Sequence, residues 1–333
     1  MTTSAPALED VGAAVTATPL LAAHLACGIR RAALDLNRRG AVVAVSGGVD
    51  SGVVAALCVE ALGASHVLLL RLPERDLGEG SSDLGEQLAD RLGAPSVEVP
   101  ISDTLAALVC YAEQERALRQ VLPEYETGWP YKVVRSDSNA DVIVFFLVVE
   151  RPDGSQVRCR IPSGPYRTLL AATNMKQRVR TLLQYTWADR HHYLVAGTPN
   201  LLEYDQGFFV KGGDGLADVK PIAGLYKQQV YALARHFQLP EGIASRAPTT
   251  ETFTLAQSQD EFYFGYPHGL MDLFVWGERT GVPAAELAVR AGVDGVVVEA
   301  AYREVASRRK ATRYLQAPAV VLDPGPDPHS GRL

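Results

Sequence analysis

The sequence predicts an α/β fold in which a parallel sheet is flanked by helices, with an inserted β-hairpin and a helical C-terminal extension. Three observations lead to this prediction. Short apolar runs alternate with helical patterns in the first part of the chain, and the run 41–45 passes through two glycines into an apolar helix. Two strand-like runs on either side of residues 152–154 then break the alternation. Alternation indicates parallel strands with right-handed crossovers, whereas a hairpin is antiparallel and lies outside that plan.

The first part of the chain is expected to supply most of the parallel sheet. Ligands of such sheets bind beyond the carboxyl ends of the strands, so Ser46 and Arg71, which lie at two such ends, are candidate site residues. Helices are predicted at 19–38, 53–62, 82–92 and 103–120, and strands at 41–45, 66–72 and 96–99.

Residues 123–173 are predicted to be an insertion built on a β-hairpin. The runs 141–150 and 156–161 carry the residues of strands, and Pro152-Asp153-Gly154 between them is a typical turn sequence. A hairpin does not fit the alternation of strands and helices before it. We therefore expect it to interrupt the main domain.

The main domain is expected to resume at residue 174, so that 1–122 and 174–282 form one nucleotide-binding unit. Residues 240–266 are rich in Pro, Thr, Ser and Gln and are predicted to be a mobile lid, because loops of that length are usually lids or disordered. Residues 283–333 are predicted to add helices and a Pro-rich tail. The remaining elements are helices at 174–188 and 225–237 and a strand at 193–196.

The connection between the first strand and its helix is the most informative segment, Ser46-Gly47-Gly48-Val49-Asp50-Ser51. Two glycines let the backbone approach an anion, and the free N–H groups at the helix N-terminus favour a phosphate there. Asp50 would repel phosphate unless a divalent cation lies between them, so Mg²⁺ is implied. The segment matches neither G-x-x-x-x-G-K-[ST] nor G-x-G-x-x-G. A plain strand-to-helix turn is the alternative interpretation.

Composition argues against several classes of function. A net charge of −6 does not suit an electrostatic grip on nucleic acid. The four cysteines show no metal-ligand spacing and are expected to be free thiols in a reducing cytoplasm. The longest apolar run, 142–149, is too short to cross a membrane as a helix, and the N-terminal residues lack the pattern of a secretory signal. We therefore expect a cytoplasmic protein that binds neither nucleic acid nor membrane.

A second group of charged residues lies in and just after the Gly-rich segment 197–222, which follows a predicted buried strand. Glu203 could complete a magnesium site with Asp50, while Lys211 and Lys227 could neutralise a triphosphate. Loops in such positions often carry active-site residues. Taken alone, the segment is equally well interpreted as a solvated loop with scattered charges.

Together the two segments resemble the NAD synthetase family of the ATP pyrophosphatases, whose fold is a Rossmann-like, adenine-nucleotide α-hydrolase-like sheet. The resemblance covers roughly residues 20 to 315. Several separate motifs occur in the family's order, which makes the match specific. They are Ser46–Ser51, Arg71–Pro73, Ser82–Asp83, Asn174–Arg180, Gly197–Thr198 with Glu203, Phe208–Lys211, Gly213–Gly215, Asp218 with Pro221, Leu225–Lys227 and Pro248–Thr249.

The resemblance implies an amide-forming ligase that uses ATP and Mg²⁺. The family adenylates the carboxylate of nicotinic acid adenine dinucleotide, releases pyrophosphate and lets ammonia displace AMP to give NAD. By resemblance, the ATP-binding residues would be Ser46, Gly47, Gly48, Val49, Asp50, Ser51, Arg71, Thr198, Lys227 and Thr249, and the metal ligands Asp50 and Glu203. The acyl substrate would face Asn174, Arg178, Arg180, Lys211, Asp214 and Asp218, and the catalytic residues would be Asp50, Lys211, Asp214 and Lys227.

Two departures from the family pattern leave a second interpretation open. Leu201 stands where the family usually has Lys, two positions before Glu203, and the insertion 123–173 directly precedes the substrate-side helix. Both changes affect the acyl substrate more than ATP. The alternative is therefore a related ligase that amidates a different carboxylate. No glutaminase domain fits in this length, so free ammonia or a separate glutaminase is expected to supply nitrogen, and the family implies a homodimer.

Overall fold

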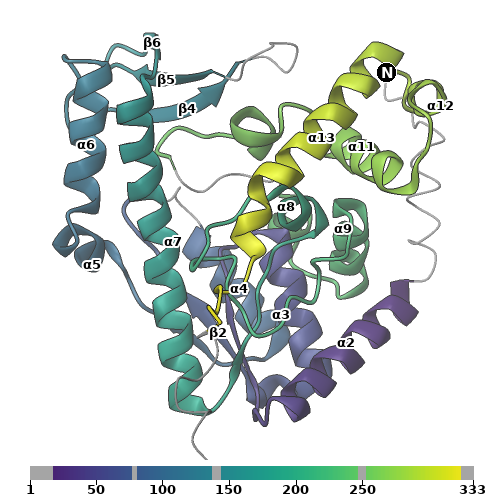
Figure 1. The fold of residues 1–333 in the computed structure, drawn as a ribbon. Coiled ribbons are helices and arrows are strands. Elements are labelled where there is room, and N and C mark those ends of the chain that lie inside the picture. The colour runs from purple at the N-terminus through teal and green to yellow at the C-terminus, as the bar shows by residue number, and fades with distance from the viewer. Residues whose placement is uncertain (1–17, 77–80, 137–143, 247–252, 324–333) are drawn as a thin grey trace, which may run out of the picture.

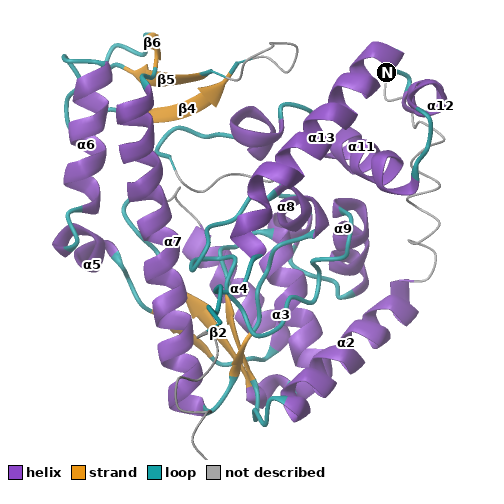
Figure 2. Ribbon diagram, in the orientation of Figure 1, coloured by secondary structure: helices purple, strands orange, loops and turns teal. Residues whose placement is uncertain are grey.

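The computed structural model describes residues 18–76, 81–136, 144–246 and 253–323, which form two separate sheets with helices around them (Figures 1 and 2). The larger sheet has the strand order β3-β2-β1-β7, and every pairing in it is parallel. Its strands are β1 (Ala41–Ala44), β2 (Val67–Arg71), β3 (Ser96–Glu98) and β7 (Leu194–Val195). The predicted parallel α/β sheet is confirmed.

One face of the parallel sheet is covered by helices that pack tightly around α3. Val53, Val54 and Leu57 of α3 are fully buried between the sheet and the neighbouring helices. Burying an apolar side chain of this kind contributes about 1.5–3 kcal/mol, so this layer fixes the start of α3 at the end of β1. The covering helices are α2 (Thr18–Asp35), α3 (Val49–Leu62) and α9 (Lys227–His236), with η1 (Ala64–His66) and α4 (Ser81–Leu92) beside them.

The other face is covered by α5 (Ser102–Ala107), α6 (Cys110–Val121) and α7 (Ser163–His191). The single helix that we predicted over 103–120 is wrong, because Val109 has a left-handed backbone with φ of 53° between α5 and α6. The break lets Leu105 pack against the parallel sheet while Leu118 packs into the second sheet. These two burial partners, distant in sequence, are the reason for the turn.

The helix α7 is much longer than predicted and runs from the second sheet to the foot of the parallel sheet (Figure 1). It begins at Ser163 instead of residue 174, directly after Pro162. Pro165 lies in its first turn, where a proline costs no intrahelical hydrogen bond. Residues 163–173, which we assigned to the insertion, therefore belong to this helix.

The second sheet is antiparallel and consists of β4 (Tyr131–Arg135), β5 (Phe145–Glu150) and β6 (Gln156–Arg160). The predicted hairpin is present as β5 and β6, although part of its first predicted strand, 141–143, lies outside the described residues. The strand β4 was not predicted. Leu147 and Val149 pack with Leu118 of α6 and Leu169 of α7, so the second sheet shares its core with the helices of the first.

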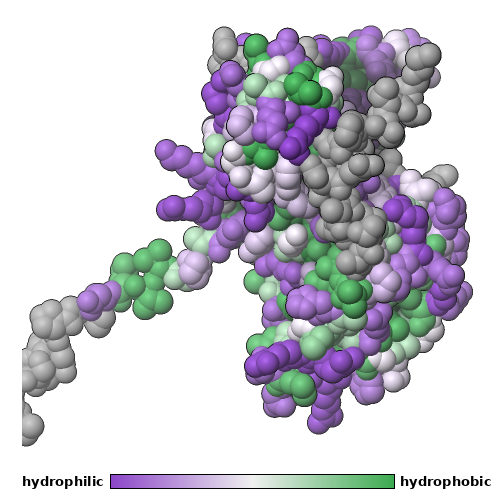
Figure 3. Space-filling view, turned by 90° about the vertical axis from the view of Figure 1, so that its right-hand side faces the viewer, coloured by the Kyte–Doolittle hydropathy of each residue, from purple (hydrophilic) through white to green (hydrophobic). Residues whose placement is uncertain are grey.

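The C-terminal helical extension is confirmed as α11 (His268–Thr280), α12 (Ala284–Ala291) and α13 (Gly295–Gln316), which pack around the short helix α8 (Leu201–Gln206). The segment predicted as a lid contains α10 (Glu241–Ala244) and a π-helical turn, η2 (Asp260–Phe264), so its described part is partly helical. After α13 the chain leaves the body, and Val320, Val321 and Leu322 are exposed there (Figure 3).

All four cysteines are free thiols, as expected from their spacing. In the described part of the chain, none of the helices combines the length and the apolar character that crossing a membrane requires.

Candidate active site

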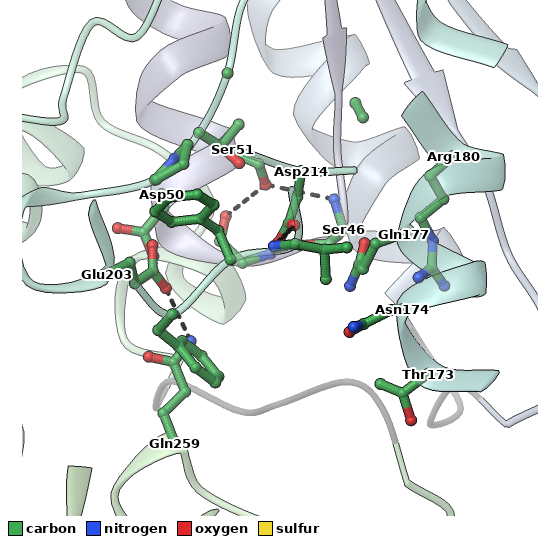
Figure 4. A pocket seen from close by; sticks show the side chains of 18 of the residues that line it. Ser46, Asp50, Ser51, Thr173, Asn174, Gln177, Arg180, Glu203, Asp214 and Gln259 are labelled. Atoms are coloured by element: carbon green, nitrogen blue, oxygen red, sulfur yellow. Dashed lines mark hydrogen bonds between the residues drawn. The ribbon is translucent and has the colours of Figure 1, made fainter. Parts of the chain in front are cut away.

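A cavity of about 480 Å³ lies beyond the carboxyl ends of β1 and β2, between the start of α3 and the middle of α7. This volume is within the range of small-molecule and cofactor sites. Ser46, Asp50 and Ser51 line one wall, while Asn174 and Arg180 project from α7 on the opposite wall (Figure 4). The cavity therefore occupies the position where open α/β sheets bind their ligands.

The glycine-rich connection forms a tight turn that opens toward this cavity. Gly47 has a positive φ of 78°, which glycine adopts without a steric penalty. The hydroxyl of Ser51 donates to the carbonyl of Gly48 at 3.0 Å, and the hydroxyl of Ser46 accepts from the N–H of Gly48 at 3.3 Å. Among the described residues, no side chain caps the start of α3, so its first N–H groups and its dipole favour an anion there.

A cluster of charged and polar side chains lies directly beside that turn. The ammonium group of Lys227 contacts Oδ2 of Asp50, and Nδ2 of Asn200 donates to Oδ1 of Asp50 at 3.3 Å. Asn200 and Glu203 form a capping box at the start of α8, each side chain accepting from the other's backbone N–H at 3.1 Å. The structure thus brings Asp50, Glu203 and Lys227 together, as the sequence predicted.

The charges in this cluster perturb one another strongly. Burial raises the pKa of Glu203 to about 7, with a further contribution from the charge of Asp50 that Lys227 partly offsets. Burial lowers the pKa of Lys227, but the carboxylates of Asp50 and Glu203 outweigh that effect and raise it overall. Two carboxylates with little access to water therefore share one ammonium group.

Asp50 and Glu203 fit a magnesium ion that is shared with a nucleotide. Mg²⁺ in nucleotide sites usually takes one or two carboxylates and completes its shell with phosphate oxygens and water. Within the described residues, no group of three or more His, Cys, Asp or Glu side chains is placed to hold a metal ion. The protein therefore offers two ligands at the turn, and a phosphate bound at α3 would supply others.

Three residues of this cluster were missed by sequence reasoning. Asn200 could have been found, because Asn-x-x-Glu before a short helix is a capping-box signature. Gln259 donates from Nε2 to Oε1 of Glu203 at 3.0 Å, and Asp272 of α11 accepts from the N–H of Lys227 at 3.0 Å. Burial raises the pKa of Asp272 to about 7. These two residues are far from their partners in sequence, and nothing local indicates the contacts.

The wall formed by α7 and the segment after α8 carries part of the predicted acyl-substrate set. Arg180 lines the cavity, and its Nη2 atom is buried without a partner among the described residues. Asp214 also lines it and accepts from the N–H of Val210 at 2.7 Å, while burial raises its pKa to about 6. Asn174 completes this group, and Thr198, which was predicted to bind ATP, also lines the cavity.

Several predicted site residues have other partners instead. Nζ of Lys211 donates to the carbonyls of Tyr314 and Ala317, at 2.8 and 3.2 Å. Arg178 donates to the carbonyl of Lys211 at 3.3 Å. Asp218 accepts from the N–H of Val195 at 2.7 Å and so supports β7.

The structure places the remaining predictions as follows. Arg71 lines the cavity, with its guanidinium bound to Glu98 at 2.8 Å. Gly47 shapes the turn without lining the cavity, and Thr249 lies outside the described residues. Leu201, in place of the family's Lys, is buried against Phe264 and Met271.

Aromatic side chains also line the cavity. Phe145 of the second sheet stacks on Tyr166 of α7, with ring centroids 4.4 Å apart. Phe262 and Tyr263 line the same cavity. The cavity therefore combines a charged region that suits a phosphate group with an aromatic surface.

Comparison with known proteins shows the family of this chain. A family model described as NAD synthase matches residues 22–122 and 159–316. The chain belongs to the NAD synthase family. The NH(3)-dependent NAD(+) synthetase of Rhizobium meliloti (strain 1021) is 44% identical over 303 residues, covering 90% of this chain and 91% of that protein. That of Mesorhizobium japonicum is 45% identical over 296 residues, covering 88% and 92%.

Solved structures of the NAD synthase type share the fold. The NMN synthetase from Francisella tularensis superposes with a TM-score of 0.65 at 19% identity, covering 92% of this chain and 98% of that one. An NH3-dependent NAD synthetase from Campylobacter jejuni gives 0.60 at 20% identity, covering 92% and 99%. The NAD synthase model leaves residues 123–158 unmatched, and these contain β4 and β5 of the second sheet.

Proposed function

We propose that this chain is an ammonia-dependent NAD synthetase. It adenylates the carboxylate of nicotinic acid adenine dinucleotide with ATP, releases pyrophosphate, and lets ammonia displace AMP to form the amide of NAD. The observation that carries the proposal is the cluster of Asp50, Glu203 and the buried Lys227 beside the uncapped start of α3. The relatives from Rhizobium meliloti and Mesorhizobium japonicum support it.

At the ATP end, the turn and the charged cluster would hold the phosphates. The N–H groups at the start of α3 and the hydroxyls of Ser46 and Ser51 bind the oxygens of the triphosphate, and Asp50 with Glu203 holds Mg²⁺. When bound, the metal neutralises charge that develops on the departing pyrophosphate. Lys227 stabilises the same charge by its ammonium group, which is already buried where the phosphates would lie.

At the acyl end, α7 would orient the carboxylate for attack on the α-phosphate of ATP. The guanidinium of Arg180 has an unused donor in the cavity, which suits an anionic group of the acyl substrate. Asp214 would hold ammonium and accept its proton as the amide forms, because its raised pKa brings it nearer to neutral pH than an ordinary aspartate. Asn174 would contact the acyl substrate, and Thr198 would contact ATP.

The test is a reaction with defined products. Purified protein, ATP, Mg²⁺, ammonium and nicotinic acid adenine dinucleotide should yield NAD, AMP and pyrophosphate in equal amounts. A parallel reaction without the acyl substrate should give no AMP. ADP as the main product would contradict the pyrophosphatase chemistry, since that class breaks the bond between the α- and β-phosphates.

A second candidate is a ligase of the same family that amidates another carboxylate. It is favoured by Leu201, which is buried in the core where the family usually has Lys, and by Phe145 of the second sheet at the cavity wall. AMP formation from a different pyridine carboxylate, with no NAD formed from the dinucleotide, would establish it. The nitrogen source in either case is ammonia or a separate glutaminase, and we propose that the protein works as a cytoplasmic homodimer.

A further inference from the structure

The segment 253–264, which lies over the cavity, is attached to the second sheet. The N–H of Leu255 donates to the carbonyl of Tyr131 at 3.0 Å, and the N–H of Tyr131 donates to the hydroxyl of Thr254 at 2.8 Å. Gln257, only 4% exposed, donates from Nε2 to the carbonyl of Val133 at 2.5 Å. The first half of the segment therefore runs along β4, with hydrogen bonds at Tyr131 and Val133.

The second half of the segment is attached to the same strand. Nη1 of Arg135 donates to the carbonyls of Tyr263 and Phe264, at 2.7 and 3.0 Å. Lys132 pairs with Glu261, their N and O atoms 2.7 Å apart. The strand β4 thus contacts both ends of the π-helical turn η2 through the side chains of Lys132 and Arg135.

Between these attachments, one residue reaches the charged cluster. Gln259 is 8% exposed, and its Nε2 atom donates to Oε1 of Glu203 at 3.0 Å (Figure 4). Its amide oxygen lies 3.0 Å from Nε2 of His268, whose Nδ1 lies 2.5 Å from Oδ1 of Asp260. The amide is held from both sides, so its NH₂ group is directed at Glu203.

We propose that Gln259 is a positioning residue for Glu203, and that the second sheet holds Gln259 in place through β4. The inference rests on the proposed function, in which Glu203 is a ligand of Mg²⁺. A metal-ligating carboxylate needs an outer hydrogen bond to fix its orientation, and loss of such a partner typically weakens metal binding by 10- to 100-fold. Because β4 and β5 lie in the part of the chain that the family model leaves unmatched, this support is separate from the matched sheet.

The contact also restricts the orientation of the Glu203 carboxylate. Oε2 of Glu203 accepts a hydrogen bond from the N–H of Asn200, and Oε1 accepts one from Nε2 of Gln259. The side chain of Asn200 in turn donates to Oδ1 of Asp50. The carboxylate is therefore fixed in direction before any ligand binds. A carboxylate fixed in this way loses less conformational entropy when it binds a metal.

The experiment measures metal binding directly, without turnover. Mn²⁺ is titrated into the full-length protein with the non-hydrolysable α,β-methylene analogue of ATP, and free Mn²⁺ is read by electron paramagnetic resonance. Gln259→Leu should raise the Kd for Mn²⁺ at least tenfold, with an unchanged melting temperature. The matched control is Gln156→Leu, a glutamine on the exposed strand β6, which should leave the Kd unchanged. Gln259→Asn, whose shorter amide does not reach Glu203, repeats the test with little change in polarity.

The role of β4 is tested by exchanging charges in one of its attachments. Lys132→Glu places two carboxylates opposite each other and should raise the Kd about two- to fivefold, the range expected for one partly exposed ion pair. The double variant Lys132→Glu with Glu261→Lys restores the pair and should restore the Kd. If the single variant binds Mn²⁺ normally, the second sheet does not position Gln259.

Two outcomes separate failure of the inference from failure of the proposed function. If Asp50→Asn abolishes Mn²⁺ binding while Gln259→Leu leaves it unchanged, the metal site stands and the positioning role of Gln259 is wrong. If Asp50→Asn and Glu203→Gln both bind Mn²⁺ as the unaltered protein does, the metal site itself is wrong, and the inference fails with it.

Discussion

The two ends of the cavity differ in how their side chains are organised. At the end that we propose binds ATP, Asp50 contacts Lys227 and is joined to Glu203 through Asn200. Asp50, Glu203 and Lys227 all line the cavity. At the acyl end, Arg180 and Asp214 line the cavity, but Arg178 and Lys211 bind backbone carbonyls elsewhere. The ATP end is therefore preorganised by charge, whereas the acyl end depends on how α7 and the segment after α8 pack.

The difference follows from where each set lies in the fold. The residues of the ATP end follow the ends of β1 and β7 or begin α9, and the parallel sheet fixes those points. The residues of the acyl end lie along one long helix and a loop, where neighbouring positions face in different directions. Substitutions at the two ends should consequently have effects of different size and kind.

The largest effect is expected from Asp50→Asn. The change removes the charge that would hold Mg²⁺ and leaves the buried ammonium of Lys227 with Glu203 as its remaining nearby carboxylate. Loss of several kcal/mol of charge stabilisation corresponds to a fall in adenylation of about two orders of magnitude or more, since each ~1.4 kcal/mol is tenfold in rate. ATP–pyrophosphate exchange measures it. Asp35→Asn, at an exposed aspartate of α2, is the control and should exchange normally.

A smaller effect at the acyl end is expected from Arg180→Met. Methionine keeps the apolar stem but removes the guanidinium, so the KM of the acyl substrate should rise by about 10- to 100-fold, the value of one hydrogen bond to a charged group. The KM of ATP should change little. Arg178→Met, two residues along α7 and outside the cavity lining, should alter neither constant. Equal effects of the two variants would show that the helix presents a different face to the substrate.

A third prediction concerns pH and the ATP end alone. Mg²⁺ binds the ionised form of Glu203, whose pKa is raised to about 7, so affinity for Mg²⁺ with nucleotide should fall up to tenfold per unit as pH decreases below 7. Without ligand, the stability of the folded protein should change with pH in the opposite direction. The raised pKa stabilises the folded state fully below the ordinary value near 4.5, and this contribution is lost as pH rises to 7. Calorimetry with and without Mg²⁺ between pH 5.5 and 8.5 measures both. Glu203→Gln should abolish the pH dependence of Mg²⁺ affinity and reduce that of stability, leaving the part that comes from the raised pKa values of Asp214 and Asp272.

The smallest effect is expected from Lys211→Met. In the structure its ammonium group binds the carbonyls of Tyr314 and Ala317, so the change should release the segment after α13 and leave the KM of ATP within about twofold. Limited proteolysis should cut the variant faster near residue 317. A loss of turnover as large as that of Asp50→Asn would instead place Lys211 among the catalytic residues, as its sequence context predicts.

Much of the fold and of the ATP end could be predicted from sequence, because the signals are local. The run 41–45 with two glycines and Asp50 predicts the strand and the turn within about a dozen residues, while the phosphate site there stays a prediction. Family membership and the C-terminal helices were likewise predicted correctly. The break at Val109 was missed because Leu105 and Leu118 are buried by different sheets, which no local pattern reveals.

The remaining parts of the site depend on contacts between distant segments. Gln259 reaches Glu203, and Asp272 supports the start of α9, only after the C-terminal helices and β4 are in place. The early start of α7 was missed for a different reason. Residues 163–173 were assigned to the insertion, although a helix accepts proline, here Pro165, in its first turn. Whether Arg178, Lys211 and Asp218 contact substrate stays a prediction.

The length of α7 has a consequence for how the protein unfolds. With 29 residues at 1.5 Å each, the helix extends roughly 44 Å, and its two halves contribute Leu169 to one hydrophobic core and Val179 to another. If one half of α7 leaves its hydrophobic core and unfolds, the other half loses neighbouring helical hydrogen bonds that stabilise it. Both sheets should therefore melt in a single cooperative transition, and excising the residues around β4 to β6 would remove part of one folding unit, not a separable module.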